Sequence, residues 1–242
     1  MIMCGSLNVV RYLVAGISLI LILNGCALFG GFFSKEEEKT PAELMSEGTN
    51  KLKWGDFEAA TEAFQKVKDR YPYSRFAVEA ELKMADALYG GEQYDEAFEA
   101  YNVFERLHPK NPDMPYVIYR KGLCYFSQVS TFDRDQSVAL HAKEEFDRLV
   151  KRFPRSEYAN RSRRMIRECY IGLAEYELYV GHFYFKMKKY RAAMGRYQYL
   201  LENYPDMGQY NEALLFYSKC REKLAIEEAE PKRSFWRWLT RS

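Results

Sequence analysis

The sequence predicts an all-α fold made of repeated pairs of helices. A short motif recurs four times, a proline follows every copy at the same distance, and no segment alternates polar and apolar residues convincingly. The motif has an alanine followed four positions later by an aromatic residue. Its copies are Phe57-x-x-Ala60-x-x-x-Phe64, Tyr94-x-x-Ala97-x-x-x-Tyr101, Ala139-x-x-Ala142-x-x-x-Phe146 and Tyr190-x-x-Ala193-x-x-x-Tyr197.

Spacings of three and four residues place the motif side chains on one face of a helix. The small alanine lets a neighbouring helix approach, and the ring fills the space beside it. A proline stands eight residues after each last aromatic residue, at Pro72, Pro109, Pro154 and Pro205. Because proline cannot continue a helix and restricts the residue before it, each helix must end there and the chain must turn.

A partner helix is expected upstream of each motif, with a small residue at its packing face. These small residues are Gly48, Ala85, Gly122 and Gly181. The whole pattern resembles the tetratricopeptide repeat, a helix-turn-helix unit of about 34 residues. The resemblance implies a right-handed solenoid of four to five such repeats.

The first 25 residues are predicted to be a signal peptide. Arg11 precedes an apolar run from Tyr12 to Leu23, which spans only about 18 Å as a helix and is too short to cross a bilayer. The run ends in Leu23-Asn24-Gly25-Cys26, which resembles the lipobox of bacterial lipoproteins, so Cys26 is the predicted acylation site. Acyl chains would anchor the protein without a spanning helix. In lipoproteins of enteric-type bacteria an aspartate after the cysteine signals inner-membrane retention, so Ala27 indicates the periplasmic face of the outer membrane.

The mature chain divides into four predicted segments. They are a flexible tether over 26–41, N-terminal repeats over 42–154, C-terminal repeats over 155–229, and a basic aromatic tail over 230–242. Two insertions lengthen the later repeats. Ser130 to Asp135 is expected to form a loop, and the absence of proline from 155 to 204 predicts a long or a kinked helix, Gly172 being the candidate position for a bend. A final capping helix is marked by Tyr210, Leu214, Tyr217 and Leu224.

The composition gives little support to catalysis or to cofactor binding. The formal net charge is only +2, which does not indicate nucleic-acid binding. Cys124, Cys169 and Cys220 show no metal-type spacing and are expected to be buried thiols, with at most one disulfide among them. The histidines lie in different repeats with no nucleophile beside them. We therefore expect a scaffold without cofactor or metal rather than an enzyme.

Repeats of this kind behind a lipobox resemble the BamD family, lipoproteins of the outer-membrane β-barrel assembly machine. The resemblance covers about 43–224. Its more specific elements are Asp69-Arg70-Tyr71-Pro72, Tyr116-x-x-Tyr119-x-x-Gly122-Leu123, Asp133-Arg134-Asp135 and Asn203-Tyr204-Pro205. It implies that the N-terminal half recognises unfolded outer-membrane proteins and that the C-terminal half docks on periplasmic domains of the barrel subunit BamA, beside other Bam lipoproteins. The ending Phe235-Trp236-Arg237-Trp238 departs from the family as we know it.

A peptide-binding groove is expected along the first helices of units one and two, where tetratricopeptide stacks bind extended peptides. Lys53 and Lys83 are candidates to meet a terminal carboxylate, and Tyr89 is a candidate to stack on an aromatic side chain. These two features occur together at the C-terminus of a barrel protein. The alternative for both lysines is a solubilising role.

A partner interface is expected in the C-terminal half. Arg196 aligns with an arginine of the family's last packed repeat and is a candidate for a charge-assisted contact with BamA. A basic face of the long helix, either solvated or a second part of the interface, carries Arg161, Arg163, Arg164 and Arg167. Two other classes remain open: another tetratricopeptide lipoprotein, such as a pilus secretin pilot or a cell-wall or division coordinator, and a periplasmic enzyme on a helical scaffold.

Overall fold

The computed structural model describes residues 38–129, 136–205 and 207–229. The chain divides into two units, Met1–Thr40 and Pro41–Ser242, and the helices described below belong to the second. The predicted signal peptide, the lipidation site Cys26, the loop from Ser130 to Asp135 and the basic aromatic tail lie outside the described residues, as does most of the tether.

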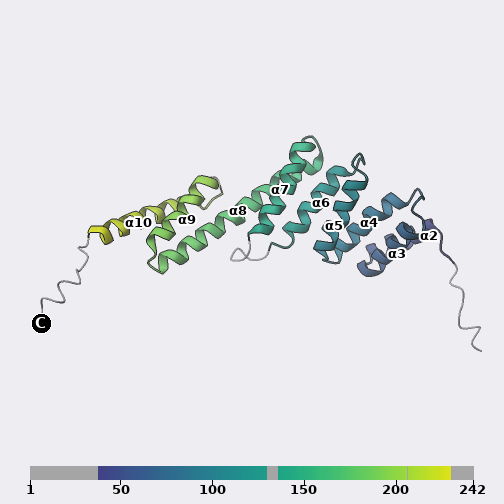
Figure 1. Ribbon diagram of the computed structural model, residues 1–242, viewed down its shortest axis with the longest axis horizontal. Helices are drawn as coiled ribbons and strands as arrows, with labels where there is room; N and C mark the ends of the chain where they lie inside the picture. Colours follow the sequence, from purple (N-terminus) through teal and green to yellow (C-terminus); the bar gives the residue numbers. More distant parts are fainter. Residues whose placement is uncertain (1–37, 130–135, 206, 230–242) are drawn as a thin grey trace, which may run out of the picture. The chain divides into compact units, whose positions relative to one another are not determined.

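The described residues form α-helices and no strand, which confirms the predicted all-α class (Figure 1). In chain order the helices are α2 (Pro41–Lys53), α3 (Phe57–Arg70), α4 (Ala77–Gly90), α5 (Tyr94–Leu107), α6 (Met114–Phe126), α7 (Ser137–Arg152), α8 (Glu157–Lys186), α9 (Tyr190–Asn203) and α10 (Tyr210–Ala229). Each helix packs on the next one along the chain. Short turns join most of these neighbours, so they run antiparallel as stacked helical hairpins, as tetratricopeptide-like repeats do.

The repeated motif forms the centre of each hairpin. Its alanine and its last aromatic residue are buried in all four copies, which lie on α3, α5, α7 and α9. Phe64, Tyr101, Phe146 and Tyr197 are among the largest fully buried side chains. Burying a large apolar side chain of this kind stabilises the fold by roughly 1.5–3 kcal/mol. The motif read from the sequence is therefore the core of the repeat.

The small residues predicted on the partner helices make room for these rings. A Cβ atom added at Gly48 would lie 2.7 Å from the ring of Phe64. At Gly122 the distance to the Phe146 ring would be 2.5 Å. Gly181 has the same relationship to Tyr197, and Ala85 shares a buried cluster with Tyr101. The two helices of a hairpin can approach this closely because the first one has little or no side chain at the contact.

The four prolines end their helices in one common geometry. The residue before each proline is the C-cap, with φ between −124° and −133° and ψ between 51° and 60°. Its backbone N–H still donates to the carbonyl oxygen four residues earlier. The proline that follows has no N–H and could not continue this pattern, so the helix stops and the chain turns.

Helix α8 is the predicted long helix, 30 residues without a break. Its first half contributes Ala159 and Cys169 to the clusters formed with α6 and α7. Its second half contributes Leu173 and Ala174 to the cluster that also contains α9 and α10 residues. One helix therefore closes the third hairpin and opens the last one, which explains why the fourth repeat is longer than the ideal unit.

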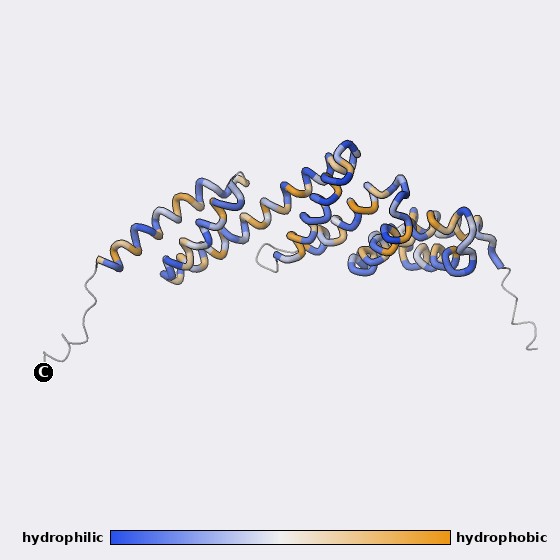
Figure 2. The backbone as a smooth tube through the Cα atoms, turned by 45° about the horizontal axis from the view of Figure 1, so that its top comes forward, coloured by the Kyte–Doolittle hydropathy of each residue, from blue (hydrophilic) through white to orange (hydrophobic). Residues whose placement is uncertain are grey.

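The capping helix α10 is present, but the predicted packing face was partly wrong. Tyr210 and Leu214 are exposed, whereas Ala213 and Cys220 are the buried residues. The face is displaced because apolar residues occur on all sides of α10, and hydrophobic segments recur along the tube of this helix (Figure 2). Sequence spacing alone could not decide which side would pack.

Candidate functional site

A groove of about 560 Å³ lies over the first helices of the second and third hairpins. Its lining residues come from α4, from α5, from the turns before α4 and α6, and from the starts of α6 and α8: Arg75, Val78, Glu79, Leu82, Lys83, Asp86, Phe104, Asn111, Asp113, Tyr116 and Tyr158. Cationic, acidic and aromatic side chains therefore meet in one concavity. This mixture suits a peptide that offers both a charge and an aromatic ring.

Asp86 organises the inner part of this groove. Its Oδ1 accepts hydrogen bonds from the phenols of Tyr101 and Tyr116, each at 2.6 Å. Arg120 Nε donates to the Tyr101 oxygen at 2.9 Å. Burial and the negative charge of Asp86 raise the pKa of both tyrosines, so the phenols stay protonated and remain donors. The network joins α4, α5 and α6 and holds the groove in shape.

Two of the three predicted peptide-binding residues lie outside the groove lining. Lys83 is a lining residue. Lys53 is exposed at the end of α2, beyond the lining residues. The ring of Tyr89 is already covered by the guanidinium of Arg120 at 3.8 Å, and its hydroxyl lies 2.8 Å from Ser127 Oγ. Peptide binding by these residues stays a prediction.

Sequence reasoning missed the groove residues Asp86 and Tyr116, and Arg120 behind them. Asp86 follows the packing residue Ala85, and Tyr116 and Arg120 occupy one segment of α6. The available signal was an aspartate next to a packing alanine, because a partly buried carboxylate needs donors. Which tyrosines would supply them depends on the packing of three helices.

A second polar cluster joins α5, α6 and α7. The ammonium of Lys121 is buried and lies 3.2 Å from Glu105 and 3.5 Å from Glu145. Arg148 pairs with both carboxylates, and Arg152 lies 3.0 Å from Glu105. Burial alone would raise the pKa of Glu105, but hydrogen bonds from Arg148 and the charge of Lys121 outweigh it and hold the pKa at about 2. This cluster is internally paired and serves stability.

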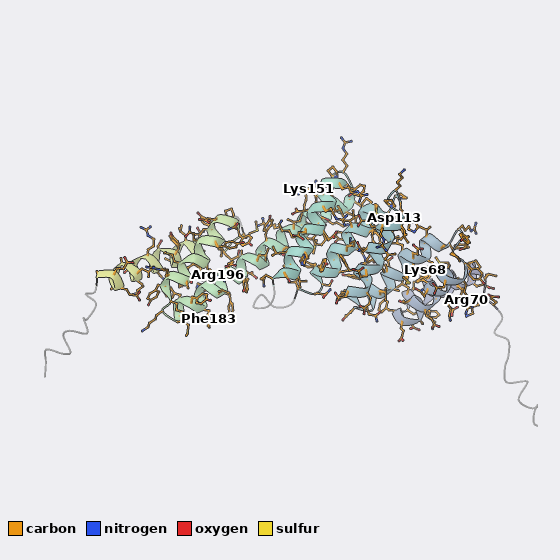
Figure 3. The ribbon with its side chains drawn as sticks, in the orientation of Figure 1. Lys68, Arg70, Asp113, Lys151, Phe183 and Arg196 are labelled. Atoms are coloured by element: carbon orange, nitrogen blue, oxygen red, sulfur yellow. The ribbon has the colours of Figure 1, made fainter. Side chains whose placement is uncertain are left out.

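Arg196, the predicted contact for a partner, has an intramolecular partner. Its Nη1 lies 3.2 Å from both carboxylate oxygens of Glu177 on α8. Glu177 is buried, whereas the side chain of Arg196 is 41% exposed. Figure 3 labels Arg196 on α9 and Phe183 on α8, an apolar side chain that is 54% exposed. The role of Arg196 at an interface stays a prediction, but its charge first neutralises Glu177.

The four predicted arginines of α8 differ in their surroundings. Arg161 lies 3.7 Å from Glu157, and Arg163 donates to Asn160 and to the carbonyl oxygen of Pro154. Arg164 and Arg167 are exposed and have no ion-pair partner among the residues that the structure describes. These two are therefore the arginines best placed to meet another molecule.

The other candidate groups have local partners or are buried. Cys124, Cys169 and Cys220 are free, buried thiols, as expected. His108 pairs with Glu81 on α4, and His182 on α8 pairs with Glu212 on α10. His141 pairs with Glu144 within α7. Over 38–129, 136–205 and 207–229, no three metal-ligating side chains gather in one place, and no helix has both the length and the hydropathy of a membrane span.

Comparison with known proteins identifies the family. A model of the YfiO family, described as an outer membrane lipoprotein, matches residues 37–235. The outer membrane protein assembly factor BamD of Rickettsia prowazekii is 33% identical over 198 residues, which cover 80% of this chain and 76% of the relative. The chain belongs to the BamD family. The match begins after Cys26, so lipidation stays a prediction.

Two further BamD proteins show the extent of the likeness. The Neisseria meningitidis serogroup B relative is 30% identical and covers 86% of this chain and 83% of its own length. The Caulobacter vibrioides relative is 32% identical over 81% of this chain, and the alignment spans 65% of that protein, just under two thirds. Among solved structures, the TPR2AB domain of yeast Sti1 matches with a TM-score of 0.43 at 16% identity, over 76% of this chain and 70% of that chain.

Proposed function

We propose that this BamD-family chain is a lipid-anchored, non-enzymatic scaffold for the assembly of outer-membrane β-barrel proteins. The observation that carries the proposal is the likeness to proteins named outer membrane protein assembly factor BamD over four fifths of the chain. The packed helical hairpins supply a rigid frame, and the candidate groups are binding groups rather than a catalytic set. Membership of this family favours BamD function over a pilus secretin pilot or a division coordinator.

The groove over α4 and α6 is the proposed site for C-terminal segments of unfolded outer-membrane proteins. Lys83 would meet the terminal carboxylate, with Arg75 as a second cation beside it. Because Arg120 covers Tyr89, the aromatic side chain of the peptide would instead contact Tyr116 and Tyr158. Their rings lie 5.5 Å apart in the groove wall. Lys53, at the end of α2, lies outside this groove and would contact only a peptide long enough to extend beyond it.

The proposed docking surface for BamA lies on α8 and α9. Arg164 and Arg167 offer unpaired charge, and Arg196 offers a guanidinium already held in place by Glu177. The second half of α8 also exposes Tyr179 and Phe183, and its C-cap residue Met187 is exposed at the same spacing of four residues. Exposed aromatic side chains beside arginine are enriched in protein interfaces. Other Bam lipoproteins would join the same complex.

Site-specific photo-crosslinking tests the proposed function. Crosslinkers at positions 83 and 116 should capture a peptide that ends in an aromatic residue with a free carboxylate, whereas positions 53 and 89 should capture it less. A scrambled peptide captured equally well would contradict the proposal. In cells, a chain carrying Cys26→Ala should lose palmitate labelling; unchanged labelling would remove Cys26 as the anchor.

A further inference from the structure

The turns that follow α3, α5 and α7 lie together along one edge of the helical unit (Figure 1). Arg152, at the end of α7, donates to the carbonyl oxygen of Pro109 in the turn after α5. Arg75, in the turn after α3, and Asn111, in the turn after α5, line the same groove. We call the three turns, with the last helical residues before them, the turn edge. Helix α2 also begins at this edge, because it runs antiparallel to α3.

The turn edge is rich in exposed cations. Those without an ion-pair partner in the described part of the chain are Arg70, Arg75, Arg106, Lys110, Lys151 and Arg155, and Lys68 beside them is half-buried. Figure 3 labels Lys68, Arg70 and Lys151 of this group. The carboxylates of the same turns are fewer, and Asp69 accepts hydrogen bonds from Gln65 while Glu157 pairs with Arg161. Tyr73 is fully exposed in the first turn, and Leu107 is exposed before the second.

Helix electrostatics explain only part of this charge. Cations in the last turns of α3, α5 and α7 are favourable, because the C-terminal end of a helix carries partial negative charge. Arg75 and Arg155 instead stand two residues before the first residues of α4 and α8, where the helix end is partially positive. A cation at such a position is unfavourable within the chain. These two residues fit an external anion, and exposed Lys110, in the turn between α5 and α6, adds to the same positive charge.

We propose that the turn edge binds the anionic headgroups of a phospholipid surface. This inference rests on the lipid anchor of the proposed function. Fourteen residues lie between Cys26 and Pro41, and a chain of that length cannot extend beyond roughly 50 Å. An acylated Cys26 would therefore keep the start of α2, and the turn edge with it, within reach of the membrane surface. Cations attract anionic lipid, and an exposed tyrosine suits the headgroup layer.

Fluorescence quenching in vesicles tests this contact on the full acylated protein. A fluorophore is attached through Tyr73→Cys at the turn edge, or through Trp54→Cys at the opposite end of the first hairpin, where Trp54 is 79% exposed. The quencher is a lipid with a spin-labelled headgroup. In vesicles with anionic phospholipid, the position 73 probe should be quenched and the position 54 probe much less. Equal quenching at the two positions, or none at position 73, would overturn the proposal.

Charge reversal separates lipid binding from a structural role. Lys110→Glu with Arg155→Glu should lower the equilibrium constant for the surface contact by about tenfold or more, since each cation near an anionic membrane contributes substantially. The melting temperature should stay nearly the same, because both positions are exposed and a carboxylate at position 155 suits the start of α8. The matched control reverses Arg221 and Lys223 on α10, both exposed, and should keep the quenching. Loss of quenching in both double variants would indicate a net-charge effect and contradict the turn edge.

The anchor and the turn edge can fail separately. If the protein does not float with vesicles, the anchor of the proposed function is wrong, and the same variants are then mixed with anionic vesicles. If the parent chain binds these vesicles and the Lys110 and Arg155 double variant does not, the result would still support lipid binding by the turn edge. If the parent chain does not bind them, the proposal would be overturned. Unchanged quenching in that variant, combined with loss of a protein partner, would make the edge a protein interface instead. Neither substitution touches the groove lining.

Discussion

Arg196 Nη1 lies 3.2 Å from each carboxylate oxygen of Glu177 and joins α9 to the packed face of α8. The Glu177 side chain is 9% exposed, so water reaches this carboxylate poorly. A buried carboxylate that loses its only close cation keeps its desolvation cost without compensation. The arginine therefore has a structural role before any partner binds.

Replacement of Arg196 by alanine should lower the free energy of unfolding by about 1–3 kcal/mol. An arginine that served an interface alone would leave the stability of the free chain unchanged when replaced. Adding Glu177→Gln should recover much of the loss, because the uncompensated charge is removed. Denaturant unfolding of the two single variants and the double variant measures the coupling. If the losses in unfolding free energy of the two single variants simply add in the double variant, the two side chains do not form a stabilising ion pair. Binding assays of Arg196 variants should be made in the Glu177→Gln background, where this stability effect is reduced.

Substitution of glycine by alanine should have opposite effects on stability at Gly122 and at Gly172. A Cβ at Gly122 would lie 2.5 Å from the Phe146 ring, so Gly122→Ala should destabilise the protein by about 1–3 kcal/mol through overpacking. A Cβ at Gly172 would meet no atom within 4 Å, so Gly172→Ala should stabilise α8 by up to about 1 kcal/mol. Thermal melts of both variants check this contrast. A stable Gly122→Ala variant would mean that the hairpin is less tightly packed than described.

Acid should weaken the α5–α6–α7 cluster through Glu105. Its pKa is lowered to about 2 in the folded protein, from an ordinary value near 4.5. A lowered folded-state pKa stabilises the protein above the unfolded-state value, and this contribution is lost as the pH falls from about 5 towards 2. Glu105→Gln should therefore destabilise the protein at pH 7 and approach the parent at pH 3. A stability difference that does not change with pH would contradict this assignment.

The sequence predicted the hairpins well because their determinants are local. Ala142 and Phe146 share a helical face whatever surrounds them, and Pro154 ends its helix in any context. The binding groups were harder, because their state depends on contacts between helices distant along the chain. The residues next to Tyr89 in the sequence do not indicate that Arg120 covers its ring. The buried face of α10 was hard to predict for a related reason, since apolar residues are spread around this helix and it packs on the side that its neighbour covers.

Cys124, Cys169 and Cys220 should be unreactive in the folded protein. Burial raises the pKa of Cys124 and Cys169 to about 12 and that of Cys220 to about 11. The thiolate is the reacting species, and little is present at pH 8. A thiol reagent should modify the chain slowly before denaturation and completely after it. Fast labelling of the native protein would show that a hairpin opens, and would also complicate attachment of probes at engineered cysteines.

The central claim is that the groove over α4 and α6 binds the C-terminal carboxylate and aromatic ring of an outer-membrane protein segment. The most direct measurement is a double-mutant cycle on the affinity of a fluorescent peptide ending in phenylalanine, with Lys83→Ala on the protein and C-terminal amidation on the peptide. Lys53→Ala, outside the groove lining, is the control. Each change alone should weaken binding by about tenfold. Both changes together should weaken it by little more, because each removes the same ion pair between Lys83 and the peptide carboxylate. Fully independent losses, or an affinity insensitive to Lys83→Ala, would contradict the account.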